Sequence, residues 1–482
     1  MVENHPVNKD LKKIQAFRAG MEKENRGIAN LGVALVFLVL VLIYTAMTQS
    51  DGSTGIFVIA AAVIGGYMAM NIGANDVANN IGPAVGSKAL TMVGALLIAA
   101  VFEAAGALIA GGDVVSTIRK GIIDPSAMAD QMTFIWAMMS ALLAAALWLN
   151  LATWVGAPVS TTHSIVGGVV GAGIAAAGAA SVAWGKMGAI AASWVISPLL
   201  GGLIAALFLL FIKKMILAKE NKLAAAETWV PVLVGIMAGA FSMYLVMKGL
   251  KKLWKPDTAM LWMIGFGSFA VVWAVTKPWV KRAAAGLENR RKSVAKLFTI
   301  PLICSAALLS FAHGANDVAN AVGPLAAIVS AAQSVDMGSG KIALPIWVMA
   351  IGAIGISIGL LLYGPKLIRK VGEKITKLNQ MRAFCVALSA AITVIAASWL
   401  GLPVSSTHIA VGGVFGVGFL REYLNSRESK KRRLTRSEEV KIAHRRLVRR
   451  RELLTIAAAW VITVPASGLL SAALFYAMSN AF

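Results

Sequence analysis

Apolar stretches of about 17 to 25 residues recur along this chain, and they constrain its fold more than any other feature. A helix of that length crosses the roughly 30 Å of hydrocarbon in a bilayer. The composition agrees, because 58% of the 482 residues are hydrophobic. Since the backbone polar groups of a segment in lipid must be satisfied internally, these stretches must be helices. The sequence therefore predicts an all-α polytopic membrane protein.

The first apolar segment, residues 28–47, follows a basic stretch that includes Lys12 and Arg18. No small-residue cleavage site follows it, so we expect a retained helix rather than a cleaved signal peptide. The two cysteines, Cys304 and Cys385, lie singly in apolar segments. This placement indicates neither a disulfide nor a metal site.

The net charge of +23 would suggest nucleic-acid binding in a soluble protein. Here the basic residues gather between apolar segments and near the end of the chain, as in residues 421–451, which hold 13 Lys or Arg against 4 Glu. Such clusters are typical of cytoplasmic loops that also contact anionic lipid headgroups. We therefore expect no nucleic-acid partner, and a multi-pass protein of the inner (plasma) membrane whose basic loops are cytoplasmic.

Two motifs occur twice, in the same order. GANDVAN stands at 73–79 and at 314–320, and the segments 157–171 and 402–416, which contain PVSTTH and PVSSTH, share ten of fifteen positions. The separations also agree, with 85 residues from Asn75 to Ser160 and 89 from Asn316 to Ser405. The chain is therefore an internal duplication.

The orientation of the halves follows from keeping the basic loops on one side of the membrane. Successive crossings then bring the two GANDVAN segments in from opposite sides, with each hydroxyl-rich motif near the turn of a hairpin, at 133–179 and 383–420. This predicts two inverted-topology repeats with re-entrant or hairpin segments and broken helices. One loop disagrees, because the basic residues Lys248, Lys251, Lys252 and Lys255 fall on the outer side.

We expect four regions. They are a basic N-terminal extension with one extra transmembrane helix at 1–54, transport repeat 1 at 55–212, a connecting region with two transmembrane helices and basic loops at 213–294, and transport repeat 2 at 295–482, which includes the basic loop 421–451.

The GANDVAN motif carries an aspartate, Asp76 or Asp317, in an otherwise apolar helix. An ionised side chain there costs at least about 2.5 to 3.5 kcal/mol without a partner, so each should face a polar cavity. The asparagines Asn75, Asn79, Asn316 and Asn320 share the helical sector of their aspartate. We expect the flanking glycines and prolines, Gly73, Gly82 and Pro83 with Gly314, Gly323 and Pro324, to weaken the helix and free carbonyls for a cation. The alternative is polar contact between helices.

The second motif places Pro158 and Pro403 before hydroxyl runs, Ser160, Thr161 and Thr162 in one copy and Ser405, Ser406 and Thr407 in the other. A half-helix that starts at the proline would present free N–H groups, its positive dipole end and hydroxyl donors to an anion. The alternative is that these side chains only cap a helix break.

Three further residues are accessory candidates. His163 and His408 follow the hydroxyl runs and could relay protons, although orienting the loop by hydrogen bonding is the role we favour. Glu103 is an intramembrane carboxylate and therefore a functional candidate, yet residues 344–363 hold no acidic twin.

Together, GANDVANNIGPAVGSKALT at 73–91, FAHGANDVANAVGP at 311–324 and the two hydroxyl-rich motifs resemble the inorganic phosphate transporter (PiT) family, over about 55–212 and 295–478. The resemblance implies inverted repeats, with phosphate between the hairpin tips and the GANDVAN segments. It implies phosphate binding by Ser160, Thr161, Thr162, Ser405, Ser406, Thr407, Asn79 and Asn320, and cation binding by Asn75, Asp76, Asn316 and Asp317. Two intact GANDVAN copies favour Na+, held at Asp76 and Asp317, over H+.

The expected function is cation-coupled symport of inorganic phosphate by alternating access, with no enzymatic activity and no cofactor. A P–OH of phosphate could donate to a carboxylate, whereas sulfate has no proton to donate. The alternatives are a carrier of another oxyanion such as sulfate, a half-helix-type channel, and an intramembrane aspartyl protease, which would not need the asparagines and hydroxyl runs. The sequence leaves homo-oligomerisation open.

We predict that a cysteine introduced by Ser429→Cys reacts with membrane-impermeant reagents only from the cytoplasmic side, because 421–451 is the most basic loop. Labelling of intact cells compared with inverted vesicles measures this. Reaction on intact cells would reverse the assigned topology.

Overall fold

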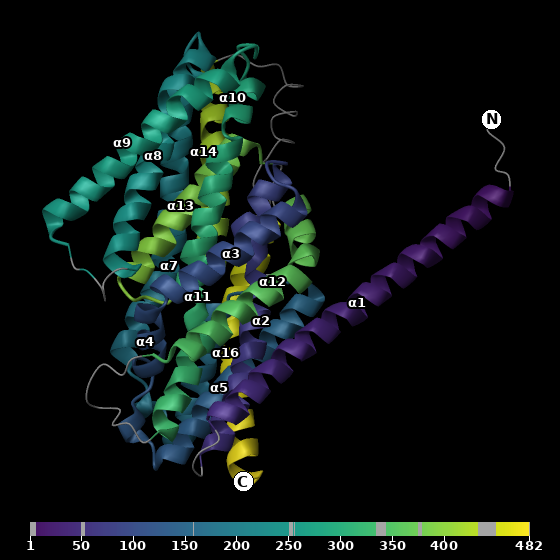
Figure 1. Ribbon diagram of the computed structural model, residues 1–482, viewed down its shortest axis with the longest axis vertical. Helices are drawn as coiled ribbons and strands as arrows, with labels where there is room; N and C mark the ends of the chain where they lie inside the picture. Colours follow the sequence, from purple (N-terminus) through teal and green to yellow (C-terminus); the bar gives the residue numbers. More distant parts are fainter. Residues whose placement is uncertain are drawn as a thin grey trace.

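The computed structural model describes residues 6–49, 54–157, 159–249, 254, 256–333, 344–374, 378–431 and 450–481. Within these residues, eleven helices are long and apolar enough to cross a membrane. They pack into one elongated bundle, from which α1 extends at an angle (Figure 1). The all-α, multi-pass membrane architecture expected from the sequence is confirmed.

The helices follow the duplicated order. The first half contains α2 (Gly55–Gly86), α3 (Met92–Ala110), α4 (Gly112–Lys120), η1 (Pro125–Ala127), α5 (Gln131–Val155), α6 (Thr161–Ala177), η2 (Ala179–Ser181) and α7 (Trp184–Ile212). The second contains α11 (Thr299–Ala332), α12 (Ile346–Lys374), α13 (Gln380–Trp399), α14 (Ser406–Lys431) and α16 (Arg450–Ala481). The helix α1 (Pro6–Thr48) precedes both halves, and between them lie the π-helical η3 (Lys213–Leu217), α8 (Lys222–Gly249), α9 (Thr258–Ala284) and the short α10 (Arg291–Leu297), which crosses the expected boundary at 294.

The two hairpins are helix pairs, α5 with α6 and α13 with α14. Each first helix ends at a glycine in the left-handed region, Gly156 at φ 70° and Gly401 at φ 68°. Glycine adopts this conformation without the cost that a Cβ would add, so it ends a helix readily. The same residue type at equivalent places makes both hairpin turns.

Close helix crossings also repeat. A Cβ at Gly314 of α11 would lie 2.0 Å from the carbonyl oxygen of Glu103 on α3, and a Cβ at Gly73 of α2 would lie 2.0 Å from that of Ile356 on α12. Only glycine permits such an approach of two backbones. Since Gly73 and Gly314 are equivalent in the duplication, Ile356 is the structural counterpart of Glu103.

Helices α2 and α11, which carry the two GANDVAN motifs, run antiparallel. Gly65 lies beside Leu325, whereas eleven residues later along α2 Asp76 lies beside His313 of α11. Equivalent helices in inverted repeats must run in opposite directions, so this arrangement is the one that the predicted topology requires.

The last helix of each half packs against the hairpin of the other half. Gly171 of α6 crosses α16 at Gly468, and Gly416 of α14 crosses α7 at Gly202, with distances of 2.1 and 1.9 Å from a Cβ to the partner's carbonyl oxygen. The two halves are therefore interlocked, and each hairpin is held from both.

The expected weakening of the GANDVAN helices is not observed. Helices α2 and α11 run without interruption through these glycines and prolines, and the breaks in the chain lie instead at the hairpin turns. At two of the glycines the physical reason is visible, because Gly73 and Gly314 allow close packing. The prolines still matter, since Pro83 and Pro324 have no N–H to donate to the carbonyls four residues earlier. Those are the carbonyls of Asn79 and Asn320.

The basic loop that disagreed with the topology is explained in part. Lys248 at the end of α8 forms an ion pair with Asp113 of α4 and lies 3.2 Å from the carbonyl oxygen of Trp399. The ion pair shows that the end of α8 and the start of α4 lie at the same end of the bundle. Lys251, Lys252 and Lys255 lie outside the described residues.

The glycine crossings generate a stability prediction. Gly314→Ala should destabilise the protein by about 1 to 3 kcal/mol, because its methyl group overlaps the backbone of α3. The matched control is Gly82→Ala in α2, where nothing lies within 4 Å of an added Cβ. Thermal unfolding in detergent measures both. Equal unfolding temperatures for the two variants would contradict the packing role of Gly314.

Candidate functional site

A buried polar cluster forms where the two hairpin turns meet the middle of α2 and α11. All twelve residues assigned from the sequence to phosphate or cation binding are at most 5% exposed. Burying so many polar groups is costly unless they are paired. Their contacts with one another therefore hold the cluster together.

Hydroxyl groups from both hairpins contact both aspartates. Thr161 Oγ1 lies 2.9 Å from Asp76 Oδ2 and 3.2 Å from Asp317 Oδ2. Thr407 donates to the other oxygen of Asp76 at 3.0 Å, and Ser406 donates to Asp317 at 3.3 Å. The two aspartates, separate in sequence, thus share one set of donors.

The asparagines reach across the duplication. The amide of Asn79 donates to Thr407 Oγ1 at 2.8 Å. The amide of Asn320 lies 3.2 Å from the hydroxyl oxygens of both Thr162 and Thr161. Each GANDVAN helix therefore holds the first turn of the hairpin helix that belongs to the other half.

Two more asparagines fasten the hairpin ends. Asn75 donates to Thr153 Oγ1 at 3.0 Å, and Asn316 donates to Ser398 Oγ at 2.9 Å. These partners occupy equivalent places at the ends of α5 and α13. Asn75 and Asn316 therefore position the turns of their own halves.

Among the described residues, several buried oxygens of the cluster have no hydrogen-bond donor. They include Asn75 Oδ1, Asp317 Oδ1 and Asn320 Oδ1. Asn316 differs, because its oxygen accepts from the backbone N–H of Val404 at 3.2 Å. Buried oxygens without donors are suitable ligands for a hard cation, which prefers oxygen.

Both second hairpin helices start with a serine cap. Ser160 Oγ accepts from the N–H of His163 at 3.1 Å, and Ser405 Oγ accepts from the N–H of His408 at 3.3 Å. These serines therefore do what the capping interpretation expected. The hydroxyl residues of the first turn, Thr161, Thr162, Ser406 and Thr407, lie inside the cluster.

The expected start of the helix at the proline is wrong for both copies. Helix α6 begins at Thr161 and α14 at Ser406, each at the third position after its proline, because Ser160 and Ser405 supply the caps. Pro158 itself lies outside the described residues.

His163 and His408 join the two hairpins. Their rings lie 4.5 Å apart, nearly perpendicular, and the ring of Trp194 on α7 lies 3.9 Å from that of His163. Trp194 also donates to the carbonyl of Pro403 at 3.2 Å. These contacts favour a positioning role for both histidines.

His313 is a site residue that the motif analysis missed. Its Nε2 lies 3.1 Å from Asp317 Oδ2 and 3.5 Å from Asp76 Oδ2, and its Nδ1 lies 3.1 Å from Glu103 Oε2. The side chain is fully buried. The signal was present in the sequence, because an intramembrane histidine four residues before an aspartate on one helix is a functional candidate.

Glu103 belongs to the cluster through His313 and through the amide of Asn80, which donates to it at 2.9 Å. The missing acidic twin now has an explanation. The counterpart of Glu103 is Ile356, and the residue equivalent to His313, one before its GANDVAN motif, is Ile72. Both isoleucines are fully buried. The imidazole–carboxylate pair thus lies where α3 of the first half meets α11 of the second, and isoleucines occupy the corresponding positions on α12 and α2.

The arrangement can hold opposite charges side by side. Ligand atoms of Asp76, His313 and Asp317 lie within 4.8 Å of one another, close to the oxygens that lack donors. The first turns of α6 and α14 meet the same cluster, and the N–H groups of a helix's first turn have no partner inside the helix. These are the features of an anion site next to a cation site.

Residues 72–471 match the sequence family described as the Phosphate transporter family. Two similar proteins are each described as "Putative phosphate permease". The one from Helicobacter pylori strain J99 is 53% identical over 89% of this chain and 80% of its own length. The one from Pyrococcus abyssi is 38% identical over 86% of this chain and 96% of its own length.

One solved structure has the same fold. It is titled "The sodium-dependent phosphate transporter" and superposes with a TM-score of 0.78 at 35% sequence identity. The match covers 88% of this chain and all of that chain.

The Glu103–His313 pair generates a coupling prediction. Glu103→Ile and His313→Ile should each lower stability, because each leaves one buried polar group without its partner. The double variant places isoleucines as at the equivalent positions 72 and 356, so its loss should be smaller than the sum by at least about 0.5 kcal/mol.

Unfolding of the four proteins in detergent measures this coupling. A double variant whose loss equals the sum of the single losses would show that the two side chains act independently.

Proposed function

This chain belongs to the phosphate transporter family, and from that premise we propose that it is a secondary active transporter that carries inorganic phosphate together with Na+. Members of this family are transporters rather than enzymes. The single observation that carries the proposal is the contact of hydroxyls from both hairpins with both aspartates. One site is thereby built from both halves of the chain.

The phosphate would bind at the first turns of α6 and α14. There the free N–H groups and the positive dipole ends of two helices converge. Thr161, Thr162, Ser406 and Thr407 add hydroxyl donors, which would exchange their carboxylate partners for phosphate oxygens. A P–OH of phosphate can in turn donate to Asp76 or Asp317. This last contact supports selection of phosphate over sulfate.

The cation would bind beside the phosphate. Support comes from the buried carboxylates of Asp76 and Asp317 and the buried side-chain amide oxygens of Asn75 and Asn320. Among the described residues, Asn75 Oδ1, Asn320 Oδ1 and Asp317 Oδ1 have no hydrogen-bond donor. Asn316, also assigned from the sequence, would act by holding the tip of the second hairpin. A bound cation would neutralise the aspartates and so raise the affinity for the anion, and linkage makes this effect reciprocal.

Protons are the second candidate for the coupling ion. The observation in their favour is His313, which contacts both aspartates and Glu103. The residue equivalent to His313 in the first half is Ile72, so a single imidazole is available at these positions to exchange a proton with the carboxylates. Sodium remains the first candidate because the oxygens without donors are ligands for a hard cation.

Alternating access would arise from the interlocked halves. Each hairpin contacts a GANDVAN helix of the other half through Asn79 or Asn320, and it packs on the last helix of the other half. Rocking of one hairpin unit against the other would break the hydroxyl–carboxylate contacts on one side at a time. A channel, in contrast, would not need hydroxyl–carboxylate contacts between the two halves that break during each transport cycle.

The test is uptake by the purified protein in liposomes, with phosphate, sulfate, Na+ and a pH gradient varied separately. We expect saturable phosphate uptake that requires a Na+ gradient, and little uptake of sulfate. Asp76→Asn and Asp317→Asn should each abolish coupled uptake, because both carboxylates belong to the shared cluster. Leu207→Ala on the outer surface of α7 is the control and should behave as the wild type.

Each other outcome identifies a rival. Uptake driven by a pH gradient alone would identify H+ instead of Na+ as the coupling ion. Flux without saturation would indicate a channel, and equal uptake of sulfate would indicate a general oxyanion carrier. Unchanged uptake by either aspartate variant would remove that residue from the mechanism.

A further inference from the structure

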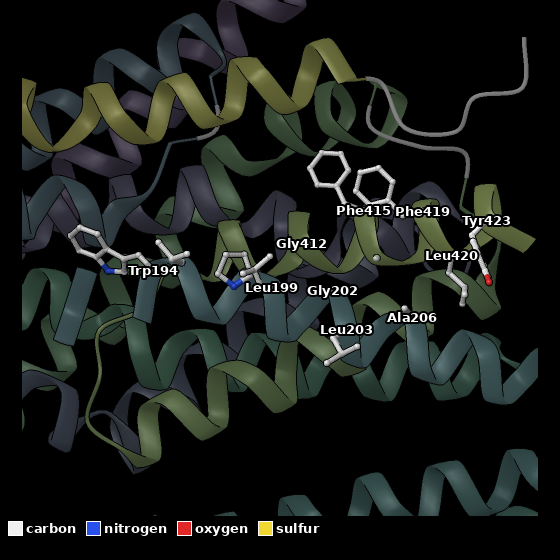
Figure 2. A pocket seen from close by; sticks show the side chains of 13 residues that line it. Trp194, Leu199, Gly202, Leu203, Ala206, Gly412, Phe415, Phe419, Leu420 and Tyr423 are labelled. Atoms are coloured by element: carbon white, nitrogen blue, oxygen red, sulfur yellow. The ribbon is translucent and has the colours of Figure 1, made fainter. Parts of the chain in front are cut away.

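An apolar groove runs along the outer surface between α7 and α14, away from the polar cluster (Figure 2). Its volume is about 720 Å³. Glycines form its floor at Gly202, Gly412 and Gly416, where the two helices touch. Leucines of α7 and aromatic residues of α14 form its walls. The hollow therefore follows directly from the close crossing.

The two helices run parallel, which gives the groove a direction. Gly412 contacts Pro198 and Gly416 contacts Gly202, so residues at the same height along the two helices differ by 214 in residue number. At one end of the groove lies Trp194, which touches His163 and the tip of the second hairpin. At the other end lies Tyr423.

The length of the groove fits one leaflet of a bilayer. Its lining extends from residue 194 to 206 on α7 and from 412 to 423 on α14, which corresponds to about 16 to 18 Å along a helix. Half of the roughly 30 Å hydrocarbon thickness is a similar distance. Tyr423, at 61% exposure, would then stand at the interface, where tyrosine is enriched.

Basic residues lie just beyond the Tyr423 end. Lys213 and Arg427 continue the lining rows of α7 and α14, and they have the same depth because they too differ by 214. Lys214 and Arg427 are exposed. Arg421 lies on the same turn as Tyr423, and Glu422 is the acidic side chain beside it. The charge at this end is therefore mainly positive, which is complementary to a phosphate ester.

The walls of the groove are not repeated at the equivalent crossing of α6 and α16. The motif alignment pairs Phe415 and Phe419 with Val170 and Ile174 of α6. The phenylalanine rings of α14 stack on each other at 6.1 Å and form a wall that the equivalent helix lacks. A groove required by the transport fold alone would carry similar walls in both halves.

We propose that this groove binds one acyl chain of an anionic phospholipid, whose headgroup contacts the basic residues beyond Tyr423. Its apolar lining and one-leaflet length match the chain, and the charge at its end matches the headgroup. Because Trp194 links the inner end of the groove to the tip of the second hairpin, the bound lipid supports that hairpin from the membrane side.

Native mass spectrometry of the full-length protein tests this proposal, with phosphatidylglycerol and phosphatidylcholine of identical acyl chains as probes. The wild type should retain more phosphatidylglycerol. Ala206→Phe fills the groove and should reduce retention of both lipids. The matched control is Ala270→Phe on the exposed face of α9, which should leave retention unchanged.

The headgroup contact has its own variant. Lys214→Gln with Arg427→Gln should lower retention of phosphatidylglycerol about fivefold per basic residue removed, as expected for basic side chains near anionic lipid. Retention of phosphatidylcholine should not change. Lys281→Gln with Arg282→Gln, exposed at the end of α9, is the matched control. Unfolding temperatures establish that all variants are folded.

Three outcomes would overturn the proposal. Equal retention of the two lipids by the wild type would exclude a preference for the anionic headgroup. Wild-type retention by Ala206→Phe would place the lipid elsewhere. Loss of a dimer in Ala206→Phe, with lipid retention unchanged, would show that a second copy of the chain fills the groove.

Discussion

The burial of two aspartates in an apolar bundle is the constraint on which the rest of the structure depends. Asp76 and Asp317 are almost completely inaccessible, and carboxylates in such surroundings need several hydrogen-bond donors. The donors come from the first turns of two hairpin helices, one from each half. The hairpins must therefore end in the middle of the bundle, and their turns must hold hydroxyl residues. Satisfying the aspartates and building a binding site are thus the same requirement.

Glycines allow this arrangement by setting how close the helices come. Gly73 and Gly314 bring α2 and α11 against α12 and α3, while Gly171 and Gly416 fasten each hairpin to the last helix of the other half. A glycine destabilises an isolated helix. Here the close packing of helix backbones that glycine permits offsets this cost. The crossings also leave the groove between α7 and α14, so the same contacts shape the interior and one outer face.

The two halves have the same arrangement of helices but differ in some of their side chains. The asparagine contacts at the hairpin ends repeat closely in both halves. The Glu103–His313 pair does not repeat, because Ile72 and Ile356 occupy its counterpart positions. A transporter built from inverted repeats needs equivalent frames to open toward either side. Side-chain chemistry does not have to repeat, and the polar pair marks the crossing of α3 and α11 as different from the equivalent crossing of α12 and α2.

The sequence by itself determined the membrane class, the order of the apolar segments, the duplicated motifs and their polar residues, because apolar length and exact repetition are local properties. It did not determine the continuity of α2 and α11, since the packing partner of Gly73 or Gly314 is distant in sequence. Only the fold showed that Glu103 lies beside His313 and that Ile356 is the counterpart of Glu103 in the duplication. Such contacts depend on how helices from different halves cross. Only the tertiary structure decides which buried oxygens of the described residues have a hydrogen-bond donor and which have none.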